Sequence, residues 1–188
     1  MTLAEIMRLA LRQLDEDPAD ISDFADLFRN YANEGYHIAV SRHYRPREVM
    51  MLHTDENGEA YIDGMDIVRI VDLKGEYGQA VYHRVTPDGA KIATAMRDAE
   101  LTAVCEVTYP CMTSDADSPR IPEYAHQGLV DYICYRHLMS GNSAKQSRAM
   151  AYYQQFSRAM QGIEPHGTGS ATRFKNLYAA TDIRNVWG

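Results

Sequence analysis

The chain has 188 residues, of which 45% are hydrophobic and 24% are charged, as in an ordinary folded globular protein. Its length is sufficient to bury a core of its own. The formal net charge of -7 argues against a protein whose main task is to grip the phosphate backbone of nucleic acid, because that task needs clustered positive charge.

The cysteines and the hydropathy of the chain indicate the cellular compartment in which the protein is found. The three cysteines are scattered, at positions 105, 111 and 134, which favours a reducing environment over a disulfide framework. The first residues already show helix chemistry, and no run of about 18 apolar residues occurs. We therefore expect neither secretion nor membrane insertion, and a protein that is made and kept in cytoplasm.

Two helices are predicted at the start of the chain. The first covers residues 2–14, where Thr2 and Glu5 can form a capping box ahead of an apolar stripe. The segment from Asp15 to Pro18 ends it. The second covers residues 22–42, because apolar side chains recur there at helical spacing.

After Pro46 the pattern changes to short strand-like runs. We expect strands at residues 48–54, 60–63, 66–73, 79–86, 90–95 and 101–109, with an Asn57-Gly58 turn after the first. One packed and one wetted face are indicated by the alternation of Ile67, Arg69 and Val71 and of Val104, Glu106 and Thr108. The region 48–109 is predicted to be one small antiparallel sheet with the strand order of a meander.

The remaining folded part is predicted to be helical. Residues 110–120 form a loop rich in Asp, Ser and Pro, and Pro122 suits the first position of a third helix, residues 122–139. A short break leads to a fourth helix, residues 143–162, which indicates a helical hairpin. The expected fold class is α+β. A helical bundle of two N-terminal helices and a C-terminal hairpin carries the β region in its middle, and residues 1–163 form a single domain.

Residues 164–188 are predicted to be an extended tail that binds a partner. A stretch rich in Gly and Ser separates the fourth helix from several large side chains, which need a surface to bury against. Either they fold back on the same subunit or they dock on another chain, and we favour docking. The expected partner-binding residues are Arg173, Phe174, Leu177, Tyr178, Ile183, Val186 and Trp187.

Motifs for chemistry are lacking in the sequence. It has no Gly-rich phosphate loop, no Gly-x-Ser-x-Gly elbow and no His-Glu-x-x-His pair. Cys134 and His137 have a metal-like spacing but no second close pair. The acidic clusters at 15–17 and 114–118 fit solvated turns better than a catalytic carboxylate pair. We expect no catalytic residue, no metal and no cofactor, so the chain is predicted not to be an enzyme.

Two features leave alternatives open. The basic stretch with Arg42, Arg45 and Arg47 is either the cationic end of a helix or a contact patch of a small nucleic-acid-binding or regulatory module. The 13 tyrosines fit partly buried helix faces, where they serve core packing or contacts between subunits.

The order of these parts resembles that of the head-tail adaptor, or connector, proteins of tailed bacteriophages. The local matches are residues 27–36 (LFRNYANEGY), the passage from Val107 through the Asp-rich loop to Ile121-Pro122-Glu123-Tyr124, and residues 152–156 (YYQQF). The similarity covers roughly residues 1 to 163 and rests on packing and turn patterns.

The resemblance implies a structural virion protein at the head-tail interface, present in host cytoplasm during assembly. Its subunits would form a ring, of twelve copies in this family, docked under the portal protein. The ring would extend the channel through which packaged DNA passes without specific binding, and would offer a platform to tail or nozzle proteins. In several relatives the C-terminal segment reaches the portal, which suits the tail described above.

Overall fold

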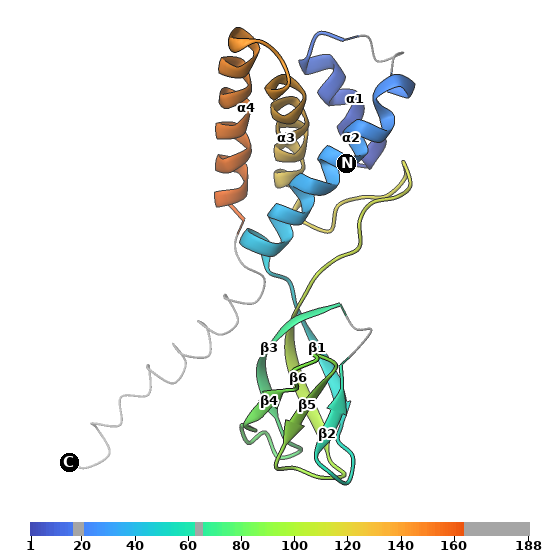
Figure 1. Ribbon diagram of the computed structural model, residues 1–188, viewed down its shortest axis with the longest axis vertical. Helices are drawn as coiled ribbons and strands as arrows, with labels where there is room; N and C mark the ends of the chain where they lie inside the picture. The colour runs from blue at the N-terminus through green and yellow to red at the C-terminus, as the bar shows by residue number, and fades with distance from the viewer. Residues whose placement is uncertain (17–20, 63–65, 164–188) are drawn as a thin grey trace, which may run out of the picture. The chain divides into compact units, whose positions relative to one another are not determined.

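The computed structural model describes residues 1–16, 21–62 and 66–163, and the predicted tail at 164–188 lies outside them. The described residues divide into two compact units. Residues 1–44 and 109–163 form the helical unit, and residues 45–108 form the β unit. The predicted α+β class is confirmed, with four α-helices and two small antiparallel sheets (Figure 1).

The helical unit contains the four α-helices close to their expected positions. They are α1 (Leu3–Gln13), α2 (Ile21–Ile38), α3 (His126–Met139) and α4 (Ser143–Gln161). Two short elements differ from expectation: α2 continues into the π-helix η2 (Ala39–Tyr44), and α3 is preceded by the 3-10 turn η3 (Glu123–Ala125). Pro122 precedes that turn with an extended ψ of 138°, so it lies one residue before the helical backbone begins.

The N-terminus of α1 shows how the sequence fixes a helix end. The Oε2 atom of Glu5 accepts from the backbone of Thr2 at 2.8 Å, and the Thr2 hydroxyl accepts from the backbone of Glu5 at 3.3 Å. This reciprocal capping box satisfies two backbone donors that a helix start leaves without partners. The apolar stripe that follows is buried against the rest of the unit, with Leu3, Ile6, Met7, Ala10 and Leu11 at its centre.

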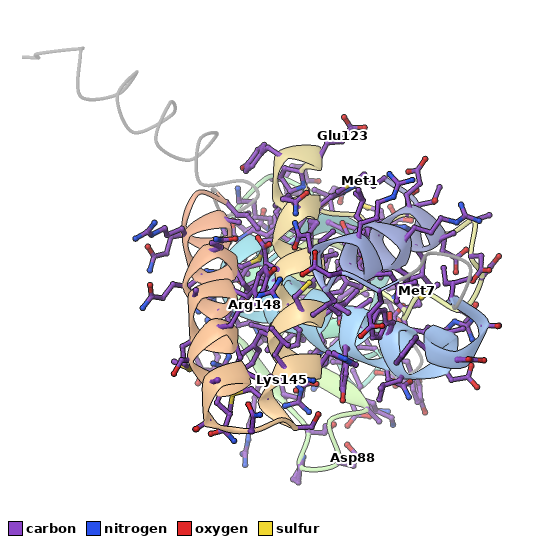
Figure 2. The ribbon with its side chains drawn as sticks, turned by 90° about the horizontal axis from the view of Figure 1, so that it is seen from above. Met1, Met7, Asp88, Glu123, Lys145 and Arg148 are labelled. Carbon is purple, nitrogen blue, oxygen red and sulfur yellow. The ribbon has the colours of Figure 1, made fainter. Side chains whose placement is uncertain are left out.

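Helix α3 is the centre of the helical unit. It contacts α1, α2 and α4, and it lies between α4 and the two N-terminal helices in both views (Figures 1 and 2). Two glycines permit this close packing. A Cβ on Gly35 would lie 2.9 Å from the ring of Tyr132, and one on Gly128 would lie 2.7 Å from the terminal methyl of Met160. Arg148 (Figure 2) also ties α4 to α1, because it donates to the carbonyl of Gln13 at 2.8 Å.

The β unit corrects the expected strand order. Its strands are β1 (Arg47–His53), β2 (Glu59–Tyr61), β3 (Ile67–Lys74), β4 (His83–Val85), β5 (Lys91–Thr94) and β6 (Glu100–Val107). They form two antiparallel sheets, with the orders β1-β6-β3 and β2-β5-β4, so the prediction of one meander was wrong. The last strand in the chain takes the centre of the first sheet, because β6 is a long strand with one fully apolar face, formed by Leu101, Ala103, Cys105 and Val107.

Both sheets contribute to the buried core of the β unit. Its largest members include Leu52, Leu73 and Leu101 from the first sheet and Ile92 from the second, each at most 3% exposed. The predicted Asn57-Gly58 turn is present: Gly58 has a φ of 80°, which favours glycine. No helix in the described part of the chain is long and apolar enough to cross a membrane.

Candidate functional site

The loop of residues 110–120 in the helical unit is held in place by the side chain of Asn33, in the middle of α2. The amide of Asn33 donates to the carbonyl of Met112 at 2.9 Å and accepts from its backbone nitrogen at 2.8 Å. Both hydrogen bonds are partly buried, and the Met112 side chain is only 3% exposed. Asn33 therefore pairs with the loop as a second strand would, and fixes its position on α2.

The same loop also caps α1. The backbone nitrogens of Leu3 and Ala4 donate to the carbonyls of Asp117 and Asp115, at 2.7 and 3.1 Å. Arg29 of α2 lies 3.2 Å from the carboxylate of Asp115. Two helices and a loop that are far apart in sequence thus share one hydrogen-bonded junction, which we call the loop junction.

The acidic residues of the loop serve its own backbone. One carboxylate oxygen of Asp117 accepts from the backbone nitrogens of Thr113 and Ser114, at 2.7 and 2.8 Å. These hydrogen bonds lower the pKa of Asp117, since they stabilise its ionised form. The carboxylate of Asp117 is thus used for turn geometry, as the sequence indicated, whereas that of Asp115 pairs with Arg29.

A cleft of about 580 Å³ lies beside the loop junction. It is lined by Tyr36 of α2 and by loop residues from Pro110 to Arg120, including the exposed Cys111. The hydroxyl of Tyr36 accepts from the backbone of Arg120 at 3.1 Å. The guanidinium of Arg120 lies 5.4 Å from the centre of the Tyr109 ring. Most of the lining residues of the cleft belong to this loop, and the cleft is large enough to receive a side chain of a partner protein.

Helices α3 and α4 present an exposed surface of aromatic rings and methionines. We call it the α3–α4 face and define it by Tyr135, Met139, Met150 and Tyr153. The rings of Tyr135 and Tyr153 contact each other with their centres 4.9 Å apart. Met139 and Met150 each lie one helical turn away on the same sides of their helices, and 38% and 47% of their surface is exposed. Exposed groups of this kind are typical of protein interfaces.

The β unit carries a second exposed surface, the outer face of the sheet β1-β6-β3. Val49 and Met51 of β1 are 69% and 62% exposed, whereas the β6 residues that point to the other side of the sheet, Leu101, Ala103, Cys105 and Val107, are buried. Val68 of β3 is 65% exposed and lies at a register shift. Two register shifts in β3 lie beside Val68 and Val71, and they interrupt the alternation expected there. The predicted packed face is present in β6, but the opposite face of this strand is only partly wetted, because Glu106 is buried and Thr102 and Val104 are half-buried. We call this surface the sheet face.

An ion-pair cluster stands at one end of the sheet face. Glu106 is 7% exposed and accepts from Arg69 through both carboxylate oxygens, at 2.8 Å each. Arg47 lies 3.6 Å away on the other side. Arg69, with a smaller contribution from Arg47, lowers the pKa of Glu106, so this carboxylate stays ionised.

This cluster bears on the predicted basic stretch. Arg47 is engaged with Glu106, and Arg42 belongs to the helical unit whereas Arg45 and Arg47 belong to the β unit. The part of the chain that the structure describes thus gives Arg47 a structural partner.

Cys134 and His137, the metal-like pair of the sequence, have structural roles. The thiol of Cys134 points to the carbonyl of Ala10, and burial raises the pKa of Cys134 to about 12. The ring of His137 packs edge-on against Phe24 and Phe28. Among the described residues, no group of three or more His, Cys, Asp or Glu side chains could hold a metal ion.

The seven partner-binding residues expected in the tail, from Arg173 to Trp187, lie outside the described residues. The surfaces described above were not singled out from the sequence. Tyr135 and Tyr153 belong to the tyrosines assigned to partly buried helix faces, so their presence at a surface had a signal. Asn33 and the sheet face had no such signal, because their roles depend on partners far away in sequence.

No protein-family model matches the chain, and no curated protein matches it.

Proposed function

We propose that the chain is a structural virion protein, a head-tail adaptor that forms a ring under the portal protein, extends the DNA channel and links head to tail. The proposal assigns it no catalytic residue, metal or cofactor. In the proposed virion, the four helices form the bundle of the adaptor and the β unit is an insertion in it. Packaged DNA passes through the channel without specific binding.

The observation that carries the proposal is the α3–α4 face. A subunit that works alone has little use for the exposed Met139, Met150 and Tyr153 beside the half-buried Tyr135 on neighbouring helices. Side-by-side packing of such helices, repeated with rotational closure, produces a ring. The resemblance of residues 1 to 163 to the adaptor family supplies the portal as the surface on which the ring closes.

The loop junction supports the same reading. It joins α1, α2 and the loop through at least five hydrogen bonds or ion pairs, counting those of Asn33, Leu3, Ala4 and Arg29. A stiff junction suits a protein that must hold its shape while DNA moves through a channel. The cleft beside it offers a place for the platform contact with a tail or nozzle protein.

The ring can be tested with paired variants of α4. Met150→Glu combined with Tyr153→Glu places charges on the α3–α4 face, and Gln155→Lys, an exposed change on the opposite side of α4, is the matched control. We expect at least tenfold fewer complete rings on portal with the double variant than with the wild type. We expect the control to form complete rings at the wild-type level. Ring formation by the double variant at the wild-type level would show that this face is not the contact.

The tail is assigned to attachment. We expect that deletion of residues 164–188 leaves a folded chain whose far-ultraviolet circular dichroism matches the full protein but which no longer binds portal. Burial of rings such as Phe174, Tyr178 and Trp187 would supply the anchors that dominate interface energy. Normal portal binding by the truncated chain would refute this part of the proposal.

A further inference from the structure

The sheet face has a regular arrangement of side chains, given by its strand register. Directly paired residues of antiparallel strands point to the same side of a sheet. The face therefore consists of four rows in order, which are Arg47–Glu106–Arg69, Val49–Val104–Asp72, Met51–Thr102–Lys74 and His53–Glu100. The two middle rows contain its apolar side chains, and the outer rows contain charges.

The two ends of the sheet face carry opposite charge. At one end, Arg47 and Arg69 share a single carboxylate, that of Glu106, and Arg45 adds a further positive charge. At the other end, Glu100 is exposed, and the adjoining turns add Asp55, Glu56 and Asp98, which outnumber Arg97 in the same turns. Lys74, one row away, is paired with Asp72. Four rows at about 6.8 Å per row put the ends about 20 Å apart. The face is therefore apolar in its middle, positive at one end and negative at the other.

Such a face is complementary to itself in one orientation. We infer that the sheet face binds the sheet face of a second copy of this chain, with the strands of the two copies antiparallel and a two-fold axis at the level of Met50. In this orientation the positive end lies over the negative end of the second copy. Val49 then lies over Met51 of the second copy, and Asp72 over Lys74 of the second copy.

Other arrangements of two sheets are less favourable. If the strands of both copies were parallel, the arginine row would lie over the arginine row of the second copy. Continuation of the sheet from β3 of one copy to β1 of the next would also bring like ends together, and the two bulges of β3 make that edge a poor template. Antiparallel pairing of β1 with β1 of the second copy would join unlike ends, but it would leave Val49 and Met51 uncovered, whereas antiparallel stacking of the two faces buries them.

The sheet face is small, so the dimer that it forms is weak. Three strands spaced about 4.8 Å apart and about 20 Å long give a contact of roughly 300 Å² on each copy, below the area of standard stable interfaces. The pair is therefore weak and reversible. A two-fold pair is complete with two copies of the chain. The pair can therefore form from the free chain, and it does not depend on the proposed adaptor ring.

Sedimentation velocity of the full chain over a concentration series tests the pair. We expect a concentration-dependent shift from monomer to dimer, and at least a tenfold weakening in the variant Val49→Lys with Met51→Lys, whose sites are exposed. Tyr82→Lys with Val85→Lys is the control, because these residues are exposed on the other sheet segment of the same unit. A monomer at all concentrations, or equal weakening by the control, would overturn the inference. Melting curves confirm that all variants are folded.

Cross-linking tests the orientation. In a background with the exposed Cys111 replaced by Ser, Met51→Cys and His53→Cys are each treated with a bismaleimide that spans about 10 Å. Antiparallel stacking places the two Met51 sites about 7 Å apart along the strands but the two His53 sites about 20 Å apart. We expect dimer from Met51→Cys only. Cross-linking of His53→Cys to the same extent would contradict the antiparallel pair, whereas failure of portal binding would bear on the adaptor proposal alone.

Discussion

Asn33 shows how one side chain can hold two distant segments together. Polar amides are poor helix formers because they compete with the backbone for hydrogen bonds. In this chain the amide is used elsewhere, since both of its ends are satisfied by the backbone of Met112, 79 residues later in the sequence. A partly buried amide with two good hydrogen bonds is costly to remove, because its backbone partners are left without replacements.

We expect Asn33→Ala to lower the free energy of unfolding by roughly 1–3 kcal/mol, since the nitrogen and carbonyl of Met112 lose their partners. Asn30→Ala on the same helix is the control, because Asn30 is exposed and the substitution changes helix propensity equally. Urea unfolding of both variants measures the difference. Equal stability of the two variants would mean that the loop does not depend on Asn33.

Asp131 is a buried carboxyl on α3, 5% exposed, and burial raises its pKa to about 6. The pKa of an unfolded aspartate is about 3.9, so the folded state holds the proton more tightly. The contribution of Asp131 to the free energy of unfolding is therefore complete below about pH 4 and is lost as the pH rises through about 6. We expect Asp131→Asn to be more stable than the natural chain by roughly 1–3 kcal/mol at pH 8, with little difference at pH 4. Thermal unfolding at both pH values measures this, and an advantage independent of pH would contradict it.

At the scale of elements, the contact between α2 and α3 depends on the missing side chain of Gly35. We expect Gly35→Ala to destabilise the chain by roughly 1–3 kcal/mol, because the new methyl would lie 2.9 Å from the Tyr132 ring and overpacking of this kind strains the core. This outcome is opposite to the gain that alanine gives in an exposed helix. Gly162→Ala at the end of α4 is the control, since a methyl there meets ordinary contacts. Chemical denaturation compares the two, and a stabilised Gly35→Ala variant would contradict the account.

The elements also show what the sequence can predict. The helices were placed within a few residues, because apolar spacing and caps such as Thr2 with Glu5 are local signals. Strand positions were also close, but the pairing of β6 with β1 and β3 was missed. Pairing of residues 28 to 59 positions apart leaves no mark in local periodicity. The loop junction and the apolar sheet face were missed for the same reason.

At the scale of the whole molecule, the chain combines a helical unit that contains the loop junction with a β unit that carries the sheet face. Its predicted tail, with Trp187 near its end, would attach the assembly to portal. The net charge of -7 suits a channel wall along which DNA slides, because phosphates are not held by it. We expect no salt-dependent DNA binding by the isolated chain at low ionic strength. A mobility shift that disappears with added salt would favour the nucleic-acid-binding alternative.

The most direct measurement is electron cryo-microscopy of the full chain mixed with the portal protein encoded in the same genome. The adaptor account predicts a closed ring of this chain on one end of the portal, with twelve copies as the resemblance implies, the α3–α4 face between neighbouring copies and a central channel wide enough for duplex DNA. A portal that remains bare at saturating concentrations of the chain would contradict it.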